Sequence, residues 1–204
     1  FNLLAIMINK SFDEIKREII ENLSEESGNQ KFIFLTGAAG TGKTTLLESV
    51  KHEIDKKKIV VAPTGIAALN IGGTTINSAF RIGFDTIPKI NKSEDPAFRK
   101  LLKNLELLVI DEISMVRAPM LDAISQSLQI HRKSNKPFGG IDVIVCGDLF
   151  QLPPVVKQNE EDEIYAKYDS VYFFDAYSFK DIEEKIFYEL NESFRQEEDE
   201  NFFN

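Results

Sequence analysis

Residues 37–44 read GAAGTGKT and match the phosphate-loop pattern G-x-x-x-x-G-K-[ST]. Residues 31–36, which are apolar from 32 to 35, precede this loop and predict a buried strand, and residues 44–54 follow it with apolar positions at helical spacing. A strand that turns through a glycine-rich loop into a helix is the context in which this pattern binds phosphate. Of all features of the sequence, this one constrains the fold most, because it predicts an α/β domain with a phosphate site.

Each residue type in this loop has a chemical reason. Glycines let backbone N–H groups approach phosphate closely, Lys43 reaches the β and γ phosphates, and the Thr44 hydroxyl suits Mg²⁺. The predicted nucleotide contacts are Gly37, Ala39, Gly40, Thr41, Gly42, Lys43, Thr44 and Thr45.

Three further apolar segments, residues 59–62, 107–110 and 141–146, predict strands. They are apolar nearly throughout, which is typical of parallel strands covered on both faces. Helices are predicted between them, one of which opens at Pro119. A first amphipathic helix is predicted over residues 11–23, where residues 11–14 read as a capping box. The expected fold is therefore α/β, a mostly parallel sheet with helices on both faces.

Two adjacent carboxylates, Asp111 and Glu112, follow the predicted strand 107–110. Together with the phosphate loop, they predict that Asp111 holds Mg²⁺ through its water shell and that Glu112 deprotonates an attacking water. The alternative is a solvated strand end. ATP and Mg²⁺ are thus the expected substrate and cofactor.

Two polar stretches, residues 62–80 and 147–155, also begin at strand ends, where open α/β sheets bind ligands. The first is dense in small residues and hydroxyls that suit a phosphodiester backbone, and Phe80 is expected to stack on a base. In the second, Gln151 is a neutral side chain able to sense a γ-phosphate. On the residues alone, each stretch could equally be a polar loop without function.

Together, the motifs from residue 32 to residue 196 closely resemble the Pif family (petite integration frequency) of 5′ to 3′ DNA helicases. They include APTGIAALNIGGTT at 62–75, DEISMV at 111–116, GDLFQLPPV at 147–155 and LNESFRQ at 190–196. The resemblance implies a RecA-like P-loop NTPase domain that couples ATP hydrolysis to translocation on single-stranded DNA. It also implies unwinding at single-strand/duplex junctions and roles in DNA repair, recombination and, in eukaryotes, telomere maintenance.

The resemblance further assigns roles by position. It makes Lys43, Glu112, Gln151 and Arg195 the catalytic residues, with Thr44 and Asp111 at the metal. For DNA contacts it points to Thr64, Gly65, Asn77, Ser78, Phe80 and Pro153. A Gln that the family uses to read adenine has no counterpart near residues 9–14, which leaves adenine selectivity open.

The expected organisation has three parts. Residues 1–8 are interpreted as a tag remnant, residues 9–196 as one RecA-like domain, and residues 197–204 as the start of a truncated continuation. Within the domain, residues 85–103 are expected to form an inserted loop or small subdomain. Because the motifs of a second RecA-like domain are missing, we expect this chain alone to be a monomer with weak or no activity.

Composition excludes few functions. Apolar residues make up 43% of the 204 residues, which excludes global disorder, and no apolar run approaches the roughly 20 residues of a membrane-spanning helix. The net charge is −9, but residues 157–204 carry 15 acidic and 5 basic residues and hold the whole acidic excess. A nucleic-acid site on the neutral remainder is therefore compatible with the charge.

The single cysteine, Cys146, excludes an intrachain disulfide and favours a reducing compartment. That compartment would be the cytoplasm or nucleoid of a prokaryote, or the nucleus or mitochondrion of a eukaryote. Both histidines, His52 and His131, are expected to be solvated on helix surfaces. Two other functions stay open, a DNA-dependent ATPase or nucleotide switch that never unwinds, and a small-molecule kinase.

Overall fold

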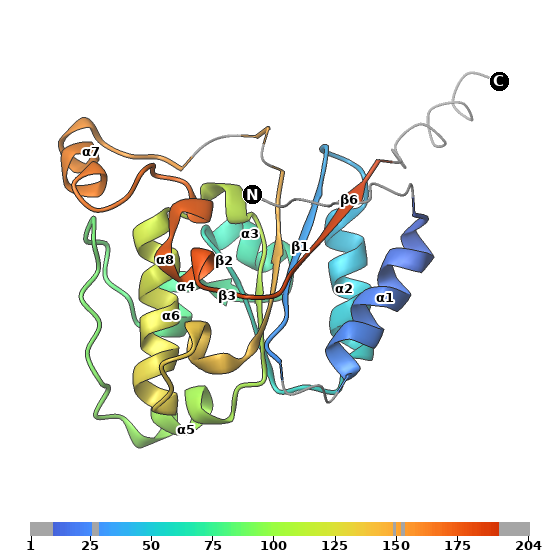
Figure 1. Cartoon of the computed structure of the whole chain (residues 1–204), viewed down its shortest axis with the longest axis horizontal. Coiled ribbons are helices and arrows are strands. Elements are labelled where there is room, and N and C mark those ends of the chain that lie inside the picture. The colour runs from blue at the N-terminus through green and yellow to red at the C-terminus, as the bar shows by residue number, and fades with distance from the viewer. Residues whose placement is uncertain (1–9, 26–28, 149, 152–153, 192–204) are drawn as a thin grey trace.

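The computed structural model describes residues 10–25, 29–148, 150, 151 and 154–191 (Figure 1). The helices are α1 (Phe12–Ser24), α2 (Lys43–Glu53), α3 (Gly65–Asn70), α4 (Ile76–Phe80), α5 (Pro96–Asn104), α6 (Ala118–Arg132), α7 (Gln158–Tyr165) and α8 (Tyr177–Lys180), with 3₁₀ turns η1 (Ile113–Met115), η2 (Pro137–Gly140) and η3 (Phe173–Asp175). The strands are β1 (Phe32–Gly37), β2 (Lys58–Ala62), β3 (Thr74–Thr75), β4 (Leu107–Ile110), β5 (Asp142–Cys146) and β6 (Lys185–Leu190). Within these described ranges, no helix is both long and apolar enough to cross a membrane.

The strands form one six-stranded sheet in the order β3-β2-β4-β5-β1-β6, and all neighbouring pairs are parallel. This confirms the expected α/β class and the four predicted strands. β3 and β6 lie outside the predicted segments, because β3 has two residues and β6 is a half-buried edge strand. In β6, Tyr188 and Leu190 are buried whereas Phe187 and Glu189 are exposed.

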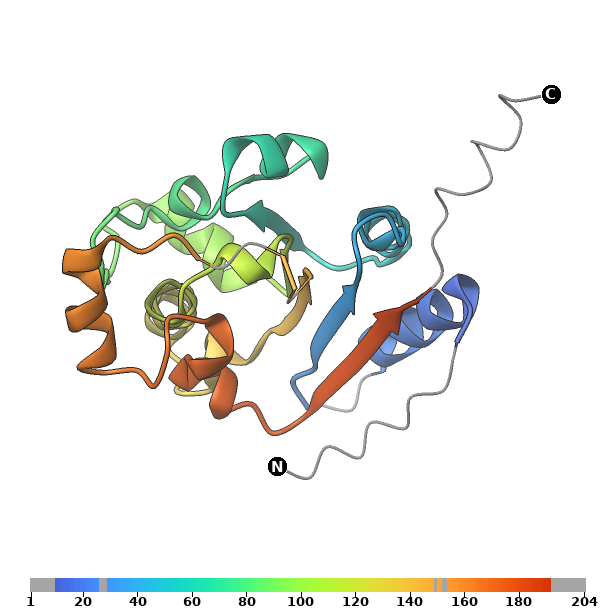
Figure 2. The ribbon, with the colours of Figure 1, turned by 90° about the horizontal axis from the view of Figure 1, so that it is seen from above.

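Helices cover both faces of the sheet, as expected. α1 and α2 lie on one face and α4, α5, α6 and α8 on the other (Figure 1), and the sheet runs between the two layers when the molecule is seen from above (Figure 2). Successive β1 residues point to opposite faces, so Phe32 and Phe34 pack in one core cluster and Ile33 and Leu35 in the other. Burial on both faces explains why the central strands are apolar at every position.

The N-terminal helix forms as its capping box predicts. The Ser11 backbone N–H donates to the Glu14 carboxylate (2.8 Å), and the Glu14 N–H donates to the Ser11 hydroxyl (3.3 Å). Ile15, Ile19 and Leu23 then form the buried stripe of α1, which packs against α2. These contacts place α1 beside β6 in the smaller of the two core clusters.

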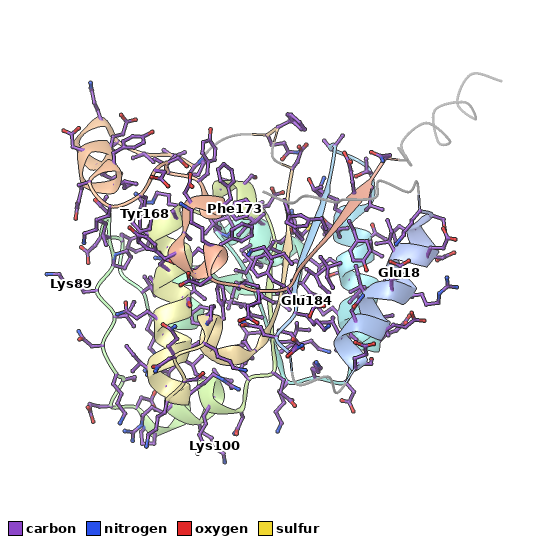
Figure 3. All side chains as sticks on the ribbon, in the orientation of Figure 1. Glu18, Lys89, Lys100, Tyr168, Phe173 and Glu184 are labelled. Atoms are coloured by element: carbon purple, nitrogen blue, oxygen red, sulfur yellow. The ribbon has the colours of Figure 1, made fainter. Side chains whose placement is uncertain are left out.

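The segment 85–103, expected to be an inserted loop, is only partly irregular. Its second half belongs to α5, which Asp95 caps by accepting from the Ala97 N–H (2.8 Å), and which buries Phe98 and Leu102 in the core. The first half runs without helix or strand along the outer side of α6, and Lys89 there points away from the molecule (Figure 3). The amphipathic pattern of α5 covers too few residues to stand out in the sequence.

The position of His131 contradicts the expectation that both histidines are solvated on helix surfaces. His52 is exposed as predicted, but the His131 side chain is only 8% exposed, between α6 and the segment that precedes α5. Its Nε2 accepts from the Ser93 N–H (3.0 Å), so its Nδ1 carries the proton and donates to the Ser127 carbonyl (2.7 Å). A long-range contact with Ser93 therefore makes His131 a structural residue, and no periodicity along α6 could have predicted that contact.

Candidate active site

The predicted motifs meet at one edge of the sheet. Because all strands are parallel, the loops after β1, β2, β4 and β5 leave from the same side, at the top of Figure 1. A cavity of about 910 Å³ lies among them. Its lining residues are Thr44, Thr64, Ile66, Ala67, Asn70, Asp111, Glu112, Ser114, Met115, Phe150 and Gln151.

In the phosphate loop, the lysine side chain is hydrogen-bonded to carbonyl groups of the loop itself. The Lys43 ammonium donates to the carbonyl oxygens of Gly37 (2.7 Å) and Ala38 (2.8 Å), and the Thr41 hydroxyl also donates to Ala38 (2.9 Å). Gly42 caps α2 at φ 82°, a left-handed conformation that favours glycine. Lys43 must therefore give up two carbonyl contacts when a phosphate takes their place.

The other predicted contacts surround this lysine. Thr44 and Thr45 are exposed in the first turn of α2, Ala39 is exposed in the loop, and Thr44 also lines the cavity. Gly37 packs against the end of β6, since a Cβ built on it would lie 2.5 Å from the Leu190 carbonyl oxygen. The loop conformation thus depends on both flanking elements, β1 and β6.

The two carboxylates after β4 differ in environment. Asp111 is 5% exposed, and its Oδ1 accepts from the Glu112 N–H (3.0 Å). Burial raises the pKa of the Asp111 carboxyl, while that N–H, Cys146 and the Lys43 charge act against the rise. A buried carboxylate beside an exposed threonine hydroxyl offers the oxygen ligands that Mg²⁺ prefers, so Asp111 and Thr44 fit that ion.

Glu112 is held by the backbone in a special conformation. Its φ of 52° and ψ of 45° are left-handed, which is uncommon for a residue with a side chain. Burial raises the pKa of the Glu112 carboxyl, the charges of Asp111 and Asp148 raise it further, and Lys43 opposes them. A carboxylate with a raised pKa is a better proton acceptor in catalysis.

The loop after β5 brings Gln151 to the same cavity. Asp148, which is buried, accepts from the Phe150 N–H through Oδ1 (2.9 Å), and its carbonyl accepts from the Gln151 N–H (3.2 Å). This turn leaves Gln151 exposed at the cavity and Phe150 99% exposed at its rim. Sequence reasoning singled out Gln151 but missed Asp148, although an aspartate after the glycine that follows a strand was a signal for such a turn.

The predicted DNA contacts divide into two groups. Thr64 caps α3 by accepting from the Ala67 N–H (3.2 Å), Gly65 is exposed with open space around it, and Thr64 lies on the cavity wall. Thr64 therefore shares the cavity with Asp111 and Glu112, and Gly65 follows it as the first residue of α3.

The other group lies on α4, none of whose residues is among those that line the cavity. Ser78 is exposed, while the Asn77 side chain donates to the carbonyls of Ile82 (3.0 Å) and Gly83 (3.1 Å). Phe80 is 3% exposed and packs in the larger core cluster, so the expectation that it stacks on a base is wrong for this structure. Arg195 and Pro153 lie outside the described residues.

Comparison with known proteins gives the same picture. A family model described as PIF1-like helicase matches residues 7–202. The ATP-dependent DNA helicase PIF1 of Candida albicans is 34% identical over 100% of this chain and 22% of its own length. The human helicase of the same name is 42% identical over 63% of this chain and 21% of its own length.

Solved structures agree in fold. Bacteroides Pif1 bound to single-stranded DNA superposes with a TM-score of 0.82 at 41% identity, covering 96% of this chain and 45% of that one. The same helicase in complex with ADP-AlF3 and single-stranded DNA gives 0.81 at 42% identity, covering 94% and 44%. The chain thus spans about a fifth of these curated relatives and less than half of the solved ones. With the family model covering nearly all of its residues, the chain belongs to the PIF1-like helicase family.

Proposed function

We propose that this chain is the ATP-binding motor domain of a 5′ to 3′ DNA helicase that moves on single-stranded DNA and unwinds duplexes. One observation carries the proposal. A single cavity joins Thr44, Asp111 and Glu112, which suit ATP hydrolysis, to Thr64 and its neighbours on α3, which suit a DNA strand. The relatives crystallised with ADP-AlF3 and with single-stranded DNA support both assignments.

The residues on the cavity wall account for hydrolysis. Thr44 and Asp111 would hold Mg²⁺, which neutralises charge on the phosphates. Lys43 leaves its two loop carbonyls and binds the β and γ phosphates. Glu112 accepts a proton from the attacking water while the water oxygen forms a bond to the γ-phosphorus. The bond from that phosphorus to the ADP oxygen breaks.

Gln151 would couple the presence or loss of the terminal phosphate to the rest of the protein. Its amide lies on the same cavity and can hydrogen-bond the terminal phosphate, so its position reports whether that phosphate is present. Thr64, which also lines the cavity, and the neighbouring Gly65 would contact the DNA backbone. Arg195 and Pro153 keep the catalytic and DNA-binding roles that the sequence resemblance implies, as part of this proposal.

The test compares ATP hydrolysis with and without oligo-dT, on this chain and on the full-length protein. We expect full-length hydrolysis to rise strongly with DNA and to fall at least 100-fold in Glu112→Gln, since a positioned general base contributes about 10²–10⁴-fold. The matched control is Glu161→Gln, at an exposed position of α7, which should leave the rate unchanged. We expect this chain alone to bind nucleotide weakly and to leave duplex DNA intact.

A nucleotide switch that never unwinds is the second candidate. It shares the phosphate loop and the carboxylates, and strand displacement by the full-length protein separates the two. If DNA leaves the full-length hydrolysis rate unchanged, the switch is the better description.

We further propose that the chain acts as a monomer. One solved relative, however, is described as two coordinating Pif1 helicases that unwind forked duplex DNA. Sedimentation with and without a forked duplex tests this.

A further inference from the structure

Ser114 has a buried hydroxyl that the structure leaves without a partner. The residue lies in η1, two positions after Glu112, and is 4% exposed. Among the described residues, only the hydroxyls of Ser114 and Ser178 are buried without a hydrogen-bond partner. A buried polar group in this state costs about 1–3 kcal/mol, so such a group in a functional cavity calls for an explanation.

The position of Ser114 distinguishes it from Ser178. Ser114 is on the cavity wall together with Thr44, Glu112 and Gln151, whereas Ser178 lies in α8 and is not among the lining residues. Ser114 therefore shares the cavity with the residues proposed to bind the terminal phosphate and its attacking water.

Ser114 also contacts the loop that carries Gln151. A Cβ built on Gly147 would lie 3.2 Å from the Ser114 backbone nitrogen and 3.1 Å from that of Ile113. The turn after Asp111 and the loop after β5 are thus packed directly on each other. A small shift of either one when a phosphate binds changes what the Ser114 hydroxyl can reach.

We propose that Ser114 is a further binding residue, whose hydroxyl hydrogen-bonds the terminal phosphate or the water held on it by Glu112 and Gln151. The inference rests on the proposed function and deepens it. The hydroxyl is left unpartnered in the free protein and gains its partner only in the nucleoside triphosphate state. It therefore favours that state over the diphosphate state.

The test uses Ser114→Ala and the matched control Ser178→Ala in the full-length protein, with thermal melting as the first readout. Both variants remove an unpartnered buried hydroxyl, so both should melt at a higher temperature than the wild type when no ligand is added. Binding is then measured with Mg²⁺ plus ADP alone, and with Mg²⁺, ADP and aluminium fluoride, which mimics the transferring phosphate.

We expect Ser114→Ala to weaken binding of ADP with aluminium fluoride about 10- to 100-fold, the range for a lost hydrogen bond to a charged group. Binding of ADP alone should be unchanged, and Ser178→Ala should match the wild type with both probes. Ser114→Cys retains the side-chain volume with only a weak donor, so it should weaken aluminium fluoride binding as well.

Two results would overturn the inference. One is equal binding of ADP with aluminium fluoride by wild type, Ser114→Ala and Ser114→Cys. The other is a loss in Ser114→Ala that appears only for oligo-dT, which would place the hydroxyl on the DNA side. Failure of the proposed function looks different, because the wild type itself would then bind neither nucleotide probe.

Discussion

Replacing Gly147 by alanine tests the packing between the loop after β5 and the turn η1, which directly follows Glu112. A Cβ at this position would lie 2.9 Å from Ile113 Cγ2, 3.1 Å from the Ile113 nitrogen and 3.2 Å from the Ser114 nitrogen. Two of these neighbours are backbone atoms, which cannot rotate away as the end of a flexible side chain would. The added methyl group must therefore push the turn away from β5, and Glu112 moves with it.

The expected cost follows from these distances. Inserting one methyl group into a packed site costs about 1–3 kcal/mol. For a domain of this size, each kcal/mol lowers the melting temperature by roughly 2–4 °C, so Gly147→Ala should melt about 6 °C lower than the wild type. Calorimetry or far-UV circular dichroism measures this shift. In the full-length protein, the hydrolysis rate of the folded variant should fall as well, because Glu112, the proposed proton acceptor, is displaced.

Gly65→Ala is the matched control, and we expect it to change the stability of the fold in the opposite direction. No atom lies within 4 Å of a Cβ built on Gly65, and its φ is not left-handed. Alanine there should stabilise the fold by about 0.4–1 kcal/mol through the entropy of the unfolded chain. The packing argument is wrong if Gly147→Ala and Gly65→Ala change the melting temperature in the same direction.

Three further predictions concern residues whose environment the structure revealed. His131→Ala should lower the free energy of unfolding by about 1–3 kcal/mol in urea titrations, because the Ser93 N–H loses its acceptor and the Ser127 carbonyl, which lies within α6, loses one of its donors. His52→Ala at an exposed site should change the free energy of unfolding by less than about 0.5 kcal/mol. Burial raises the pKa of Asp111, so in the window above its unfolded value the folded chain binds more protons and stability falls as pH rises. Asp111→Asn in metal-free buffer should therefore melt higher than the wild type at pH 7, with a gain that shrinks toward about pH 4; a gain that is constant with pH would contradict this. Phe80→Ala should cost about 3–5 kcal/mol in denaturant titrations, as expected for a core ring, and a near-neutral result would return Phe80 to the surface.

Much of this site could be predicted from local sequence, because the residues with the relevant chemical groups lie in short contiguous motifs. The phosphate loop needs glycines, Lys43 and Thr44 within eight positions, and Asp111 and Glu112 need only a buried strand before them. Loops after parallel strands meet at the carboxyl edge of the sheet, and this rule predicts that the motifs lie close together in space. The capping box at Ser11 was local in the same way.

The features that the sequence did not reveal depend on contacts between distant segments. Phe80 and His131 both occupy positions that suit a surface by local pattern, yet α4 packs into the core and His131 receives the Ser93 N–H from 38 residues away. Whether a hydroxyl such as that of Ser114 finds a partner is likewise set by its three-dimensional neighbours. The fold class and the chemical groups of the site follow from the sequence. Which side chains face the cavity and which are buried depends on tertiary packing, because burial is a property of the assembled layers.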